Sequence, residues 1–294
     1  MNEAVAAIEK ANASGVRVSA TMYPYTAGGT GLAATLPLWV QEGGRDKMLE
    51  RLKEPATRAK ARQEIETKLD GRHPTAQSPR GGDPVWENLL MAATFDGIQV
   101  ASVPREFDQS IVGKRITEIA AERKADPWDV YFALLIDTGG RVGALYHMMS
   151  EEDVKTGLRA GFVTIGTDSS ALRSEGVLAQ GSPHPRSYGT FPRVLGKYAR
   201  DEKIFEMQTA VHRMTGAAAA QMGLRDRGLV RERYLADLVV FNPKTVKDTA
   251  TYERPHQYPN GIEYVVVNGV TVLDQKGLTG ARPGRPVYGP ARQP

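Results

Sequence analysis

The spacing of apolar residues at the start of the chain predicts a helix that leads directly into a strand. Residues 3–12 place their apolar side chains on one helical face, and Gly15 follows where a helix C-cap is expected. The run 16–23 is then rich in strand-forming residues. A helix that feeds a strand is either the start of the fold or a step from the middle of a repeating β/α pattern, and the sequence leaves both interpretations open.

Three apolar segments predict strands of a parallel sheet or barrel, because helical segments separate them and each ends in polar or aromatic residues. These segments are 16–25, 142–147 and 162–168. Active sites of such folds lie at the C-terminal ends of the strands. The residues expected there are Tyr23, Tyr25, His147 and Asp168. A closed barrel needs eight strands, and only three or four are visible.

The segment from about 43 to 126 is polar and helix-rich, and we interpret it as a helical insertion. Its pattern predicts helices over 47–52, 56–69 and 113–123, a short strand over 98–103 and a Pro/Gly-rich loop over 73–84. A further helix is expected over 127–136. These elements are expected to supply packing.

The character of the chain changes near its C-terminal end. After a helix expected over 204–222, nearly continuous apolar runs predict strands over 237–241, 262–267 and 270–273, and Asn268-Gly269 is a strong hairpin turn. We therefore divide the chain into a part of a (β/α) barrel over 1–230 and a small β subdomain over 231–294.

Composition narrows the class of protein. The 294 residues are 41% hydrophobic and 24% charged, which is typical of a globular protein, and no apolar run reaches the length of a membrane span. The 38 basic and 34 acidic residues are spread along the chain, which argues against a nucleic-acid binder. No secretory signal opens the sequence, so a cytoplasmic location is expected. Cysteine is absent, so any metal site must use His and carboxylate ligands.

Several phrases of the sequence resemble the amidohydrolase superfamily. YLADLVVFNP and IEYVVVNGVTVLD resemble the C-terminal β-sandwich signature of that superfamily. Upstream, MYPYTAGGTGLAATLPLWVQEGG, MSEEDVKTGLRAGFVTIGTDSS and SPHPRSYGTFPRVLGKYAR resemble its N-acyl-D-amino-acid deacylase (D-aminoacylase) branch. The resemblance implies an α/β fold with a partial TIM-like (β/α) barrel and a β-sandwich. It also implies a zinc centre and hydrolysis of N-acyl-D-amino acids.

The metal ligands that the resemblance implies are mostly missing. Members of this family carry a His-x-His motif on an early barrel strand, and this sequence has none. Its histidines are His73, His147, His184, His212 and His256. We therefore expect the chain to correspond to the C-terminal part of such an enzyme and to need the missing half for zinc binding and activity.

Asp168 ends the strand VTIGTD, at the place where the resemblance implies a catalytic carboxylate close to the metal, and we also predict Asp168 as a metal ligand. Such a group takes a proton from the attacking water and delivers it to the leaving nitrogen. The alternative is an Asp that caps the following turn through its side chain. The resemblance favours the catalytic role.

Arg186 and His184 lie in SPHPRSYGTF, a loop expected at the same end of the sheet. The planar guanidinium of Arg186 can bind a substrate carboxylate with two hydrogen bonds. The alternative is a loop Arg paired to a surface acid. His184 either contributes to substrate or metal binding or has a structural role between two prolines.

Tyr23 and Tyr25 can either hydrogen-bond a substrate or form an aromatic plug at the rim of the sheet. For His147, a structural role is favoured over a site role. We assign no chemistry to the remaining three histidines. Ser150 is expected to cap a helix, and the stretch GGTG lacks the residues of a phosphate-binding loop.

The leading hypothesis is a metal-dependent hydrolase that cleaves N-acyl-D-amino acids. A cyclic amidase of dihydroorotase or hydantoinase type is the alternative within the same class. The alternative from another class is a non-catalytic fragment that associates with another chain. The expected partners are a small N-acyl amino acid and either a second copy or a complementing polypeptide, with neither nucleic acid nor membrane involved.

Overall fold

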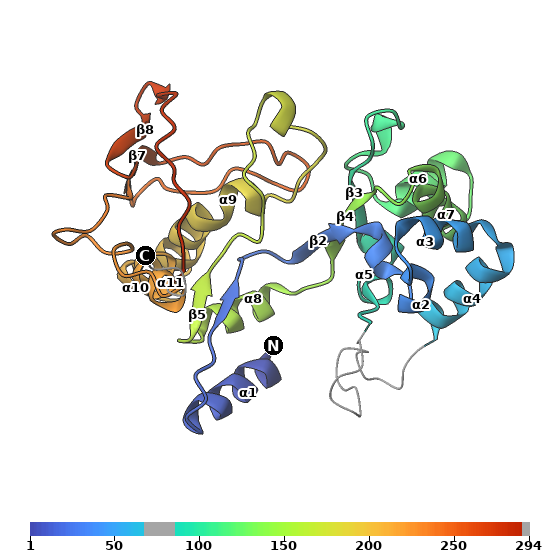
Figure 1. Ribbon diagram of the computed structural model, residues 1–294, viewed down its shortest axis with the longest axis horizontal. Helices are drawn as coiled ribbons and strands as arrows, with labels where there is room; N and C mark the ends of the chain where they lie inside the picture. Colours follow the sequence, from blue (N-terminus) through green and yellow to red (C-terminus); the bar gives the residue numbers. More distant parts are fainter. Residues whose placement is uncertain (68–85, 290–294) are drawn as a thin grey trace. The chain divides into compact units, whose positions relative to one another are not determined.

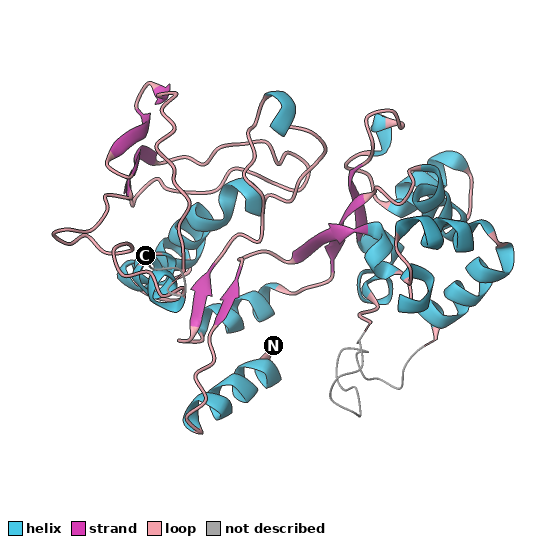
Figure 2. Ribbon diagram, in the orientation of Figure 1, coloured by secondary structure: helices cyan, strands magenta, loops and turns pink. Residues whose placement is uncertain are grey.

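The computed structural model describes residues 1–67 and 86–289, which form two compact units. Unit 1 combines Met1–Tyr25 and Ser150–Ala179 with the chain from Pro185 onward, and unit 2 combines Thr26–Met149 with Gln180–His184. The Pro/Gly-rich loop predicted over 73–84 lies outside the described residues. Figures 1 and 2 show the elements of each unit.

Unit 2 is built on a three-stranded antiparallel sheet in the order β2-β4-β3. The strands are β2 (Ala27–Gly31), β3 (Ile98–Ser102) and β4 (Gly143–His147). Its helices are α2 (Leu38–Gln41), α3 (Arg45–Lys53), α4 (Pro55–Glu66), α5 (Leu89–Gly97), α6 (Ile116–Arg123) and α7 (Pro127–Asp137), with 3-10 turns η1 (Leu32–Thr35) and η2 (Gln109–Ile111). The predicted helices and the strand at 98–103 are thereby confirmed within the described residues.

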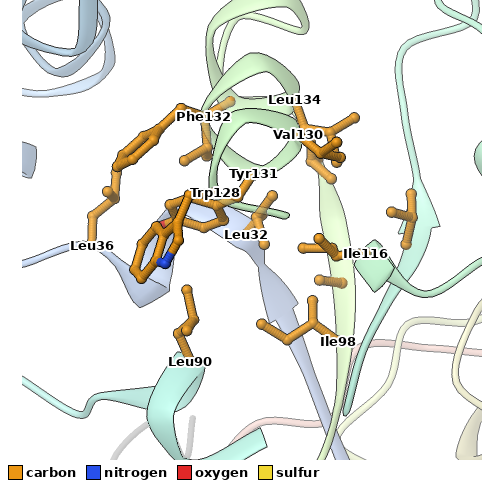
Figure 3. Packing of buried hydrophobic residues seen from close by; sticks show 14 of the residues in the cluster. Leu32, Leu36, Leu90, Ile98, Ile116, Trp128, Val130, Tyr131, Phe132 and Leu134 are labelled. Atoms are coloured by element: carbon orange, nitrogen blue, oxygen red, sulfur yellow. The ribbon is translucent and has the colours of Figure 1, made fainter. Parts of the chain in front are cut away.

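The core of unit 2 forms where α7 packs against the sheet and the other helices. Tyr131 and Leu134 are fully buried on α7, and Trp128 lies in the same cluster (Figure 3). Leu135 of α7 is fully buried as well. Buried residues of every helix from α2 to α7 and of strands β3 and β4 join this cluster. The Tyr131 hydroxyl lies 2.7 Å from the Thr35 hydroxyl, so its polar end is also satisfied.

The prediction that residues 142–147 form a parallel barrel strand is wrong. This segment is β4, which pairs antiparallel with both β2 and β3. Its partner β2 has the sequence AGGTG, which carries no apolar alternation and therefore gave no strand signal. The central strand of an antiparallel sheet and a parallel strand can both be buried on two faces, so burial alone does not distinguish them.

Unit 1 contains one parallel strand pair. Here β1 (Ala20–Met22) pairs with β5 (Val163–Ile165), which confirms the predicted parallel neighbours, although no closed barrel forms from the described residues. Around them lie α1 (Asn2–Ala13), α8 (Glu151–Arg159), the turn η3 (Gly176–Leu178), α9 (Arg186–Arg193), η4 (Val194–Asp201), α10 (Met207–Met214) and α11 (Gly216–Gln221). The helix η4 continues α9 with π-type hydrogen bonding.

Two local predictions in unit 1 have different outcomes. Ser150 caps α8 as expected, with its Oγ accepting a hydrogen bond from the Asp153 backbone N–H. The single helix predicted over 204–222 is instead two helices, because Thr215 adopts non-helical dihedral angles of −126° and −93° between α10 and α11.

A four-stranded antiparallel sheet closes the described chain, in the order β6-β7-β8-β9. Its strands are β6 (Leu238–Phe241), β7 (Ile262–Val267), β8 (Val270–Asp274) and β9 (Gly277–Leu278). The predicted hairpin turn is confirmed, since Asn268 and Gly269 both have positive φ, at 47° and 81°. No helix of the described residues has the length and apolarity to cross a membrane.

Candidate functional site

The parallel pair in unit 1 brings together residues that are far apart in the sequence. Tyr23 directly follows β1, Asp168 lies three residues after the end of β5, and Arg186 is the first residue of α9. Since β1 and β5 run in the same direction, their C-terminal ends meet at one edge. Three of the residues predicted from the sequence therefore lie together there.

Asp168 and Arg186 form an ion pair. Arg186 Nη2 lies 2.9 Å from Asp168 Oδ2, and the two side chains differ sharply in exposure, at 8% and 72%. Asp168 has a φ of 46°, a left-handed conformation that Asp tolerates better than most residues. Arg186 is thus a buried cation that faces a solvent-exposed anion.

The ring of Tyr23 supports the guanidinium of Arg186. The centre of this guanidinium lies 4.4 Å from the ring centroid, which is a favourable cation–π distance. Burial raises the pKa of the Tyr23 phenol, Asp168 raises it further, and the charge of Arg186 opposes both. The phenol therefore stays protonated at neutral pH and keeps its O–H as a hydrogen-bond donor.

Two serines that the sequence analysis did not single out flank this ion pair. Ser169 Oγ and Ser187 Oγ lie 2.6 Å apart, within hydrogen-bond distance. Ser169 follows Asp168, and Ser187 follows Arg186 in the first turn of α9. Each serine adjoins a predicted site residue in the sequence, but nothing in the sequence indicated that the two would meet.

A second ion pair fixes the chain that follows β1. Arg193 Nη1 is 2.9 Å from Asp248 Oδ2, and Arg193 Nε donates to the Pro24 carbonyl at 2.9 Å. Tyr25 is buried against this pair, with its ring centroid 4.7 Å from the guanidinium. Gly189 leaves room for Tyr25, because a Cβ at that position would collide with the Tyr25 hydroxyl and with Asp248. Of the two roles considered for Tyr25, this packing favours the structural one.

The histidines lie in several places. His184 is buried in unit 2, where its Nε2 is 2.9 Å from the Ala27 carbonyl oxygen. His147 Nε2 lies 3.1 Å from Gln99 Oε1 in the same unit, which is consistent with a structural role. In unit 1, His256 Nδ1 is 3.1 Å from the Tyr188 hydroxyl, and His212 is part of α10. His73 lies outside the described residues.

The described residues do not fit a metal centre. Within 1–67 and 86–289, no three His, Asp or Glu side chains come close enough together to hold a metal ion. Asp168, the predicted metal-proximal carboxylate, faces a guanidinium. Its predicted role as a ligand, like the site roles of Arg186, His184, Tyr23 and Tyr25, stays a prediction.

Comparison with known proteins identifies the relatives of this chain. It is 46% identical to a D-aminoacylase of Alcaligenes xylosoxydans xylosoxydans over 173 residues, which are 59% of this chain and 33% of the relative. A crystal structure of D-aminoacylase matches 95% of this chain and 44% of its own, with a TM-score of 0.65 and 35% identity.

A second structure is an N-acyl-D-glutamate deacylase from Bordetella bronchiseptica, complexed with zinc and a phosphonate inhibitor. It is 27% identical, with a TM-score of 0.64, and the match covers 93% of this chain and 43% of that one. The chain spans between 28% and 33% of the length of the curated relatives that it matches.

The family assignment does not depend on single relatives. A sequence model of the amidohydrolase family matches residues 99–273, which include β5, the ion pair of Asp168 and Arg186, the strands β6 and β7, and most of β8. The fold is a mixed α/β fold that matches D-aminoacylase structures over part of their length. The chain therefore belongs to the amidohydrolase family and is D-aminoacylase-like.

Proposed function

We propose that this chain contributes the carboxylate-binding and proton-transfer groups of an enzyme that hydrolyses N-acyl-D-amino acids. The observation that carries the proposal is the pairing of Asp168 with Arg186 at the C-terminal ends of β1 and β5. The substrate class comes from the relatives, which are D-aminoacylase and two deacylases of acidic N-acyl-D-amino acids. The preference for the D enantiomer rests on that similarity.

Arg186 suits the binding of the free carboxylate of the substrate. Its guanidinium is fixed by burial and by the Tyr23 ring, so little side-chain entropy is lost on binding. A carboxylate can accept two parallel hydrogen bonds from a guanidinium. A cyclic amide without a free carboxylate, such as a simple hydantoin, would leave Arg186 unused, so this residue favours a substrate with a free carboxylate.

Asp168 suits proton transfer because its carboxylate is exposed and lies beside Arg186, the proposed binding group for the carboxylate of the substrate. In hydrolysis, water adds to the acyl carbon and the C–N bond breaks, which gives a carboxylic acid and an amine. Asp168 would accept a proton from the water and deliver it to the leaving nitrogen. We derive no step through a metal, since the described residues form no metal cage. The zinc found in a related structure would need ligands outside the described residues, in this chain or in another polypeptide.

A second candidate function is a non-catalytic chain that associates with another polypeptide. Two observations favour it: no His, Asp or Glu cluster of metal-binding size occurs in the described residues, and the sheet formed by β6 to β9 exposes apolar side chains. The two candidates differ in whether the chain supports hydrolysis once a metal-bearing segment is supplied.

The test is an assay of N-acetyl-D-methionine hydrolysis with zinc present and with the L enantiomer as comparison. The chain is assayed alone and after mixing with the segment of the related D-aminoacylase that it does not match. We expect D-selective hydrolysis in the mixture, with Asp168→Asn lowering kcat and Arg186→Gln raising KM. Glu106→Gln is the matched control, since Glu106 is an exposed acid paired with Arg141 in unit 2. Absence of hydrolysis in a mixture shown to associate would reject the enzyme in favour of the non-catalytic chain.

A further inference from the structure

Arg186, the proposed binding group for a substrate carboxylate, already binds a carboxylate in this structure. The Asp168 oxygen lies 2.9 Å from Arg186 Nη2. One guanidinium edge can hold one carboxylate in the two-bond geometry, so a second carboxylate at that edge has to compete with the first. The chain thus contains its own competitor for the proposed substrate site.

The two members of the ion pair differ in how firmly they are held. Arg186 is buried, stacks on Tyr23 and belongs to a helix, so it has little freedom to move. Asp168 is 72% exposed and lies in a segment outside the helices and strands, between β5 and η3. An ion pair with one exposed partner is weak, because water solvates the exposed charge well. Asp168 is therefore the member that can leave.

The two neighbouring serines differ in the same way as the members of the ion pair, since one is held in a helix and the other is exposed. Ser187, on α9, is held with Arg186, whereas Ser169 is exposed and adjoins Asp168 in the chain. Displacement of Asp168 would separate Ser169 Oγ from Ser187 Oγ, which lie 2.6 Å apart. The Ser187 hydroxyl could then donate its hydrogen bond to the incoming carboxylate. Arg186, at this end of α9, would thereby exchange one carboxylate for another.

We infer that Asp168 occupies Arg186 as an internal mimic of the substrate carboxylate and is released when a carboxylate ligand binds. This inference rests on the proposed function and adds a specificity mechanism to it. An acidic substrate frees the carboxylate that is to transfer the proton, whereas a neutral amide leaves that carboxylate bound to Arg186. The same guanidinium thereby selects the substrate and makes Asp168 available.

The test measures binding rather than hydrolysis, so it does not depend on a metal or on a second polypeptide. The full chain is titrated with N-acetyl-D-alanine and, separately, with the neutral N-acetyl-D-alaninamide, while the arginine side-chain N–H signals are followed by NMR. Asp168→Asn removes the carboxylate that competes for Arg186. N-acetyl-D-alanine should therefore bind this variant roughly two- to fivefold more tightly, which corresponds to the free energy of an ion pair with one exposed partner. Binding of the neutral amide should not change.

Further variants serve as controls for this binding experiment. Glu106→Gln removes an acid of similar exposure, 68%, from an arginine pair in unit 2 and should leave both affinities unchanged. Arg186→Lys, alone and combined with Asp168→Asn, should weaken binding of the acid and abolish the gain from Asp168→Asn. Ser169→Ala leaves the ion pair in place and should alter binding less than Asp168→Asn.

The inference is overturned if folded Asp168→Asn binds N-acetyl-D-alanine as weakly as, or more weakly than, the unmodified chain. It is also overturned if the neutral amide gains as much as the acid. A failure of the proposed function alone would give a different result. The N-acetyl-D-amino acid would still compete with Asp168 in the binding experiment, but it would not be hydrolysed in the mixture. Binding and hydrolysis therefore test the two proposals separately.

Discussion

The antiparallel sheets of the two units differ in how well their apolar residues are covered. In unit 2, Ile98 and Val100 of β3 are fully buried, and Tyr146 of β4 is 1% exposed. In unit 1, Val239 and Val240 of β6 are 55% and 47% exposed, although they are equally apolar. A sheet with apolar residues on both faces is expected to be covered on both.

This difference indicates that unit 2 has the core of an independent folding unit, whereas the four-stranded sheet of unit 1 lacks cover within the described residues. The candidate chemistry lies in unit 1, whose buried cluster is smaller and gathers around Leu158, Tyr198 and Val246. All three tryptophans, at positions 39, 86 and 128, lie in unit 2, so their fluorescence reports on that unit alone. For unit 1, a cysteine placed at buried Ala210 can serve as a thiol-labelling probe, since the chain has no other cysteine.

The largest effect is expected for a cavity in the core of unit 2. Leu134→Ala removes a fully buried side chain and should lower the free energy of unfolding by about 2–5 kcal/mol. Denaturant unfolding followed by tryptophan fluorescence measures this loss. Val240→Ala, a truncation in the exposed strand β6, should cost less than about 0.5 kcal/mol by circular dichroism. Similar losses for the two variants would contradict the contrast between the sheets.

A somewhat smaller loss is expected from the ion pair that holds the chain that follows β1. In Arg193→Met, Asp248 is left without its ion-pair partner at 13% exposure, which should destabilise unit 1 by about 1–3 kcal/mol. Thiol labelling at position 210 measures the opening of this unit. The double variant Arg193→Met with Asp248→Leu should recover part of the loss, because no unpaired charge is left. A double variant less stable than the single one would show that the pair is not the source of the effect.

A smaller, pH-dependent effect is expected at Glu151. Burial would raise the pKa of Glu151, but hydrogen bonds from Lys197 Nζ at 2.5 Å and the Tyr198 hydroxyl at 2.8 Å outweigh burial and lower that pKa. Because the pKa of Glu151 is lower in the folded state, this carboxyl stabilises the fold at pH values above its unfolded pKa, near 4.5. The stabilisation is lost as the pH falls from there through the folded pKa.

The matching experiment follows the stability of unit 1 from neutral pH downward. The contribution of Glu151 should stay below about 1 kcal/mol, because the side chain is one-third exposed and solvent screens it. Glu151→Gln should flatten the profile between about pH 4.5 and the lower pKa of Glu151 in the folded state, and Glu152→Gln, which alters an 81% exposed neighbour, should leave the profile unchanged. Equal effects of both substitutions would assign the pH dependence to general charge repulsion.

Neither zinc nor a chelator that removes zinc is expected to change the thermal stability of the chain. A metal present at 100 times its Kd would stabilise the folded chain by about 2.7 kcal/mol, which is easily measured as a shift in Tm. We expect unchanged Tm values with zinc and with EDTA, since the described residues contain no cluster of ligands. The related zinc-containing deacylase should shift under the same conditions and serves as the positive control. A stoichiometric zinc-dependent shift in this chain would show that it has a complete metal site.

Features with a local signal were predicted well from the sequence. The Asn-Gly turn demands positive φ at both positions, and it formed where expected between β7 and β8. Asp168 and Arg186 were expected at the same end of the sheet, and the structure places them there as an ion pair, while their roles in catalysis and substrate binding stay predictions. Neither prediction required knowledge of distant contacts.

Features set by distant contacts were missed. The strand β2 has no side-chain alternation to reveal it, and its pairing with β4 joins segments more than a hundred residues apart. The contact between Arg193 and Asp248 spans 55 residues and carries no sequence motif. For His147, the sequence favoured a structural role without naming a partner, and the structure supplies Gln99.

The exposed strand β6 is also expected to affect how long the chain survives in a cell. It lies at one edge of its sheet, and its four residues, Leu-Val-Val-Phe, carry no charge. An uncharged apolar edge of this kind recruits other strands, which leads to aggregation. Chaperones and proteases recognise the same feature as a sign of incomplete folding. The lifetime of the chain should therefore depend on how quickly this edge is covered after synthesis.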